Sequence, residues 1–85
     1  MTKETDYNGW KNRQTWNVAL WIQNDENLYK GAVEFMKEVN PVKNPYRGFV
    51  INCGLDSQKT PDNIAYISTH LDYKALDTMM KELIQ

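Results

Sequence analysis

The sequence predicts an all-α fold in which three to four short helices pack around a central apolar helix. Apolar residues recur at intervals of three and four in several segments, which is the periodicity of helices that bury one face. One of these segments, residues 13–24, is apolar almost all round its helical wheel. The 85 residues suffice for one core. We therefore predict a single domain, residues 1–85, with residues 1–9 as a loose polar N-terminal arm.

The first predicted helix runs from Arg13 to Asn24, with Asn12 as its N-cap. Only Asn17 and Gln23 interrupt its apolar surface. A helix of this kind is either buried on every side or exposes a patch for a partner. Both alternatives remain open, because the N-terminal arm or the chain around residue 66 could cover it. Asn17 is expected to hold a neighbouring backbone segment, since an unpaired buried amide is costly.

The second predicted helix begins at Asp25 or Glu26 and ends at Val39, before an Asn-Pro pair. Its apolar residues follow the spacing of one buried stripe: Leu28, Ala32, Phe35, Met36 and Val39. Acidic residues at its start suit the positive end of the helix dipole. Glu26 and Lys30 are spaced for an ion pair on the solvent side.

Residues 46–54 predict a third, short helix after a proline. Tyr46, Phe49, Val50 and Cys53 are spaced i, i+3, i+4, i+7, and Gly54 is a typical stop. A strand is the competing interpretation, because residues 49–51 are β-prone. On the helical interpretation Cys53 lies on the inner side as a small buried hydrophobic residue rather than a nucleophile.

The remainder of the chain predicts an irregular crossing segment and a last helix. Residues 56–71 contain a turn signature at 60–63, Thr-Pro-Asp-Asn. Asp72 is the expected N-cap of a helix over 73–84. The inner stripe of that helix is predicted to consist of Tyr73, Leu76, Met80, Leu83 and Ile84.

Composition and motifs argue against catalysis and against a cofactor. One cysteine and one histidine, His70, allow neither an internal disulfide nor a zinc site. The carboxylates are scattered, and no phosphate-binding glycine motif is present. We expect no enzyme activity, no cofactor and no metal, and His70 as a surface or capping residue. No apolar run approaches a membrane span and no signal peptide is visible, so a cytoplasmic location is expected.

Two surfaces are candidates for binding a macromolecule. The tryptophans around the first helix suggest a protein-binding surface, because Trp is enriched in interface hot spots; the candidate residues are Trp10, Trp16, Val18 and Trp21. The alternative is that the same side chains only stabilise the fold. A modest basic cluster, Lys37, Lys43 and Arg47, could instead contact nucleic acid, although the net charge of −1 gives no long-range attraction to phosphates. An open Trp flank could also close a homodimer.

The segment from Gly9 to Asp25 reads GWKNRQTWNVALWIQND. It resembles a family of small uncharacterised proteins, encoded largely by bacteriophages and mobile elements, with the signature GWxNxxTWxVxLWIxND. The turn at 60–62 and residues 76–83 are similar to the second block of that family. The chain departs from that block at Asn63, where Gly is expected, and at Tyr66, where Trp is common. The resemblance implies a host bacterial cytoplasm and a host protein as partner, which the chain would inhibit or adapt, and it implies no activity.

Overall fold

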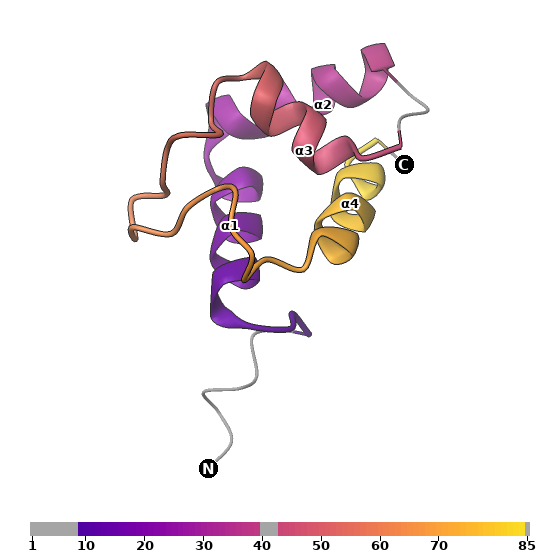
Figure 1. The fold of residues 1–85 in the computed structure, drawn as a ribbon. Coiled ribbons are helices and arrows are strands. Elements are labelled where there is room, and N and C mark those ends of the chain that lie inside the picture. Colours follow the sequence, from indigo (N-terminus) through magenta and orange to yellow (C-terminus); the bar gives the residue numbers. More distant parts are fainter. Residues whose placement is uncertain (1–8, 40–42, 85) are drawn as a thin grey trace.

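The computed structural model describes residues 9–39 and 43–84, and these residues form four helices (Figure 1). The helices are α1 (Arg13–Asn24), α2 (Glu26–Val39), α3 (Pro45–Asn52) and α4 (Tyr73–Glu82). No strand occurs within these ranges; one isolated antiparallel bridge joins Lys59 to Ala65. The all-α prediction is confirmed. All but Gly9 of the predicted N-terminal arm lies outside the described residues.

A single residue separates α1 from α2 and serves both helices. The N–H of Asp25 donates to the carbonyl of Trp21 at 2.9 Å, which closes the last turn of α1. The carboxylate of Asp25 accepts the N–H groups of Asn27 at 3.0 Å and Leu28 at 3.1 Å. These are two of the N–H groups in the first turn of α2 that have no carbonyl partner within the helix. The predicted boundaries of both helices are confirmed.

The helical interpretation of residues 46–54 is correct, and the strand alternative is wrong. Pro45 occupies the first turn of α3, and Gly54 follows the helix with φ +72°, a conformation that glycine adopts without steric cost. The N–H of Tyr46 donates to the carboxylate of Asp77 on α4 at 3.0 Å. Cys53 is exposed, contrary to the prediction, because α3 ends at Asn52 and Cys53 no longer follows the helical rotation.

Helix α4 begins as predicted and ends two residues earlier. The carboxylate of Asp72 accepts the N–H of Ala75 at 3.3 Å, which confirms the N-cap. The helix ends at Glu82 rather than at position 84, and the last two predicted stripe residues are only partly buried in the turn that follows. Met79 is buried as well, although the predicted stripe omitted it.

The four helices share one hydrophobic core. Helix α1 packs on α2 and α4, and α3 packs on α4 and α2. The buried apolar side chains are Val18, Ala19, Ile22, Ala32, Met36, Tyr46, Phe49, Val50, Leu55, Tyr66, Leu71, Leu76, Met79 and Met80. Val39 was predicted to join them but is 37% exposed, because it lies in the last turn of α2, beyond the part that faces the other helices.

The crossing segment between α3 and α4 covers one side of α1 (Figure 1). It contains no helix, as predicted for residues 56–71, and it buries the side chains of Leu55, Tyr66 and Leu71. The hydroxyl of Tyr46 donates to the carbonyl of Tyr66 at 2.6 Å, and burial raises the pKa of this phenol, so it stays a donor. Thus Tyr46 fixes the middle of the crossing segment to α3.

Candidate interaction surface

Two hydrogen-bond clusters bind the crossing segment to α1, and the first lies at the start of that helix. The side-chain carbonyl of Asn12 accepts the N–H of Thr15 at 2.9 Å and its hydroxyl at 2.7 Å. The amide nitrogen of Asn12 donates to the carbonyl of His70 at 2.7 Å, and the hydroxyl of Thr15 accepts the N–H of Asp72 at 2.9 Å. The cap of α1 is thereby tied to the cap of α4.

The second cluster is centred on Asn17, which is only 1% exposed. Its amide nitrogen donates to the carboxylate of Asp62 at 2.8 Å, and its carbonyl accepts the hydroxyl of Thr60 at 2.7 Å. The indole N–H of Trp21 donates to the same carboxylate oxygen of Asp62 at 3.0 Å. Hydrogen bonds from Asn17 and Trp21 lower the pKa of Asp62. The expectation that Asn17 holds a neighbouring segment is confirmed.

A tight turn presents Asp62 to Asn17. The hydroxyl of Thr60 accepts the N–H groups of Asp62 and Ile64, each at 3.2 Å, and the N–H of Thr60 donates to the carbonyl of Ile64 at 2.8 Å. Asn63 has φ +68°, in the left-handed region that favours glycine. The resemblance predicts Gly at this position, and Asn is the residue that best tolerates that conformation after Gly.

Burial and hydrogen bonding distinguish the four residues that were predicted to bind a protein. Val18 is 0% exposed, so its assignment to a partner-binding surface is wrong. The sequence left open whether this flank of α1 was covered, and Val18 belongs to the buried core. Trp21 is half-buried and its indole nitrogen is engaged by Asp62, which gives it a role in holding the fold together. Trp10 and Trp16 are half-buried at the surface and remain candidates.

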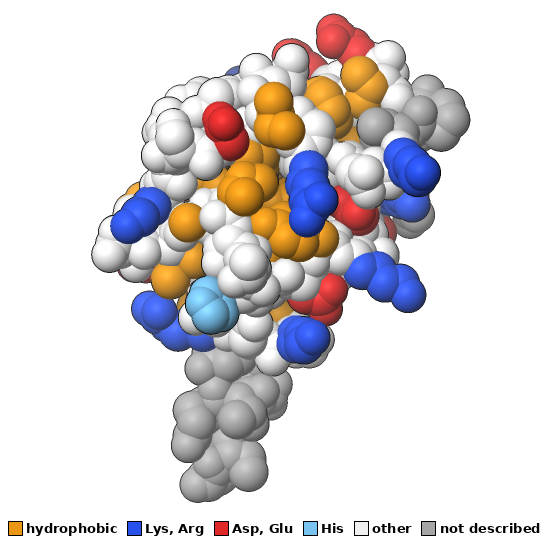
Figure 2. All heavy atoms as spheres, viewed as in Figure 1, with side chains coloured by type: hydrophobic (Ala, Val, Ile, Leu, Met, Phe, Trp, Pro, Cys, Tyr) orange, Lys and Arg blue, Asp and Glu red, His pale blue; other side chains and the backbone are white. Residues whose placement is uncertain are grey.

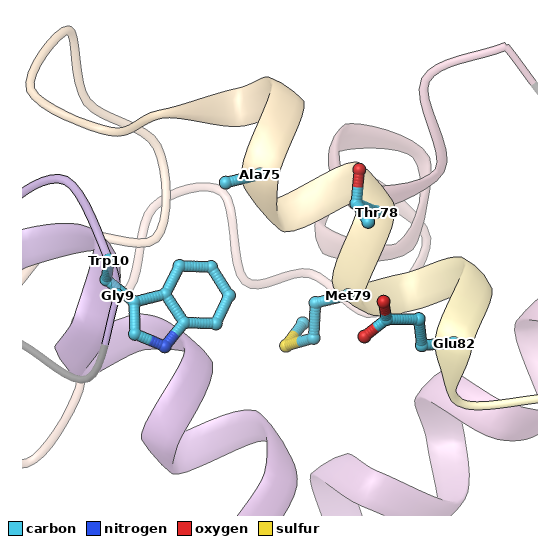
Figure 3. Close-up of a pocket in the computed structure, with 6 residues that line it drawn as sticks. All are labelled: Gly9, Trp10, Ala75, Thr78, Met79 and Glu82. Atoms are coloured by element: carbon cyan, nitrogen blue, oxygen red, sulfur yellow. The ribbon is translucent and has the colours of Figure 1, made fainter.

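Trp10 forms a wall of two neighbouring hollows. The smaller hollow, of about 180 Å³, is lined by Trp10 and by Trp16, Leu20, Gln23 and Asn24 of α1. The larger, of about 420 Å³, lies between Trp10 and α4 and is lined on the helix side by Ala75, Thr78, Met79 and Glu82. Figure 3 shows the indole between α1 and α4, with its six-membered ring toward Met79. We call the two hollows together the Trp10 surface.

The three residues of the predicted basic cluster lie in α2, ahead of α3 and in α3. Lys37 lies in the last turn of α2, beside a third hollow that Glu34 also lines. The guanidinium carbon of Arg47, on α3, lies 4.2 Å from the centre of the Tyr73 ring, so Arg47 also stabilises the contact of α3 with α4. Lys43 is exposed ahead of α3. Figure 2 shows basic and acidic side chains interspersed on one face of the molecule.

The remaining candidates for chemistry are dispersed. His70 is exposed, as a surface histidine was expected to be, and its carbonyl is the part that Asn12 contacts. Partial burial raises the pKa of the Cys53 thiol, which disfavours the reactive thiolate. Among the residues described, no three or more His, Cys, Asp or Glu side chains come together where they could hold a metal ion. None of the described helices is long and apolar enough to cross a membrane.

The fold and the Trp10 surface define a small helical domain whose half-buried tryptophans line open hollows. A family model matches residues 3–85, and the chain belongs to that family, which is a family of unknown function (DUF7249). Comparisons with curated proteins and with solved structures found no significant match.

Proposed function

We propose that the protein is a non-enzymatic protein-interaction module that binds another protein through the Trp10 surface. The observation that carries the proposal is the position of Trp10 and Trp16, which line two neighbouring open hollows at the surface. Half-exposed tryptophans of this kind are the side chains that most often dominate the energy of protein interfaces. The exposed amides of Gln23 and Asn24 supply a polar rim.

The proposed partner is a host protein, and the proposed location is a bacterial cytoplasm. Both follow from the resemblance of the Gly9–Asp25 segment to proteins of bacteriophages and mobile elements. Small accessory proteins from such genomes act by inhibiting or redirecting host machinery, so the module is proposed as an inhibitor or adaptor. This step rests on the genomic origin of the similar proteins and not on the chemistry of the Trp10 surface.

The test is affinity capture from bacterial lysate with a variant that blocks the surface without disturbing the core. Gln23→Arg places a long cationic side chain at the rim of the smaller hollow, and Gln23 is exposed. Asn52→Arg makes the same substitution at an exposed position in α3 and is the matched control. A partner retained by the natural protein and by Asn52→Arg, but lost with Gln23→Arg, supports the proposal. If every captured protein binds both variants equally, the Trp10 surface is not the interface.

Nucleic-acid binding through Lys37, Lys43 and Arg47 stays a prediction. Its test is the dependence of DNA affinity on salt, because each lost phosphate contact reduces the slope of log K against log salt by about 1. The variants Lys37→Gln and Lys43→Gln are suited to it, whereas Arg47→Gln also removes the contact with Tyr73.

A further inference from the structure

We propose that the hollow between Trp10 and α4 binds the cationic side chain of a partner protein, a lysine ammonium or an arginine guanidinium. This inference rests on the proposed function, since Trp10 belongs to both hollows of the surface. It adds the chemistry of the group that is recognised. Three features of the hollow carry it: its walls, its charge and the position of that charge on α4.

The walls of the hollow match a long side chain that ends in a cation. Met79 and Ala75 offer an apolar floor for a methylene stem, and Figure 3 views the face of the Trp10 indole, with the edge of its six-membered ring toward Met79. The face of an indole attracts cations more strongly than any other aromatic side chain. The carboxylate of Glu82 lies across the hollow from the indole and points toward it in the same view. An apolar stem and a charged head would therefore both find a complementary surface.

The hollow carries negative charge that no described residue neutralises. Within the described ranges the ion pair found joins Lys30 to Glu26 on α2 at 3.2 Å, and Lys30 lines a different hollow, beside Leu83 and Ile84. The lysines of α4, Lys74 and Lys81, lie about 100° round the helix from the side that lines the hollow, and neither lines it. The hydroxyl of Thr78 donates to the carbonyl of Lys74 at 3.1 Å, which leaves its oxygen free to accept an N–H group.

Glu82 is placed where it does not help its own helix. It is the last residue of α4, and the negative end of the helix dipole disfavours a carboxylate there. Its side chain is exposed and contributes little to the core. The carboxylate of Glu82 therefore has no evident role in stabilising α4, and it is available to a ligand in the hollow.

The experiment is a titration of the full chain with two peptides that differ only in charge. The first is acetyl-Ala-Ala-Arg-Ala-Ala-amide, and the second carries citrulline, the neutral isostere of arginine. Chemical shifts of the Trp10 indole N–H and the Met79 methyl group report on the hollow. We expect saturable shifts with a dissociation constant of about 1 mM for the arginine peptide, and at least about five-fold weaker binding of the citrulline peptide.

Two variants, each of which replaces a glutamate by the neutral glutamine, locate the site. Glu82→Gln should weaken the arginine peptide about five-fold and leave the thermal midpoint unchanged or slightly raised. Glu38→Gln makes the same change at an exposed residue of α2 outside the hollow and should leave binding unchanged. Equal affinity for the two peptides, or an effect of Glu38→Gln as large as that of Glu82→Gln, overturns the proposal. Self-association that Glu82→Gln abolishes would assign the hollow to a second copy of the chain and would overturn it as well.

The outcome is separable from that of the capture experiment. A captured partner that is lost with Gln23→Arg, together with no discrimination between the two peptides, would retain the proposed function and remove the cation site. If the protein discriminates between the peptides but no captured partner depends on Gln23, the cation site is retained and the proposed function is removed.

Discussion

The two long sides of α1 carry similar apolar residues, but one side is covered by the rest of the chain and the other is partly exposed to solvent. On one side Val18 is buried, and Asn17 and Trp21 are bonded to the crossing segment. On the other side Trp16 and Leu20 stay half-exposed beside Trp10 and line an open hollow. The difference lies in which side the chain between α3 and α4 crosses. An apolar helix surface thus predicts that another segment packs on it, but it does not show which segment does so.

Polar side chains determine which side is covered. Asn17 is joined to Asp62 and Thr60, which are 45 and 43 residues further along the chain. Its amide is useful only when those two groups are present, because one hydrogen atom and the oxygen of the amide are committed to them. This cluster therefore selects the docking position of the crossing segment, whose apolar side chains Leu55, Tyr66 and Leu71 are buried.

The largest expected effect comes from removing the centre of that cluster. Asn17→Ala leaves the hydroxyl of Thr60 and the carboxylate of Asp62 without the amide and opens a small void. We expect a loss of about 2–3 kcal/mol in the free energy of unfolding, measured by urea denaturation.

The matched control lies on the same helix. Gln23→Ala removes an exposed amide from α1 and should change stability by less than about 0.5 kcal/mol. Equal losses in the two variants would mean that the bonds of Asn17 contribute no more than a solvated side chain, and the proposed selection of the docking position would be wrong.

The elements that the sequence predicts well are those fixed by local chemistry. Asn12 caps α1, Asp72 caps α4, and Gly54 follows α3 with positive φ, so helix starts and stops agree with the structure. The errors lie at helix ends and on covered faces. Cys53 and Val39 follow the periodicity but lie at or beyond the last turns, where the helix no longer faces the core.

The candidate site was predicted less completely than the fold. Trp10 and Trp16 line surface hollows and stay candidates, whereas Val18 is buried, because periodicity within α1 does not show which of its sides the rest of the chain covers. Glu82 was missed as a lining residue. Its only local signal is a carboxylate in the last turn of a helix, which is unfavourable for the helix and so unusual.

A smaller effect is expected at the turn that presents Asp62. Asn63 has φ +68°, so Asn63→Ala keeps a Cβ in the left-handed region but removes the polar side chain that makes this conformation tolerable, and it should cost about 1 kcal/mol. Asn63→Gly should stay within a few tenths of a kcal/mol of the natural protein. Thermal unfolding of the three proteins measures this order, and an alanine variant as stable as the glycine variant would show that the turn does not hold this backbone conformation in solution.

The smallest effect concerns the charge of Asp62, which is exposed to solvent. Hydrogen bonds from Asn17 and Trp21 hold the pKa of the folded carboxyl below its ordinary value of 3.8. A depressed folded pKa contributes stability that is fully present above the unfolded pKa and is lost as the pH falls through the folded pKa. The stability difference between the natural protein and Asp62→Asn should therefore be constant from about pH 7 to pH 5 and shrink below about pH 4. Urea midpoints measured across this range test the prediction, because the other carboxylates titrate in both proteins and cancel. A difference that stays constant down to about pH 2.5 would mean that the two donors bind the neutral and the ionised carboxyl equally well.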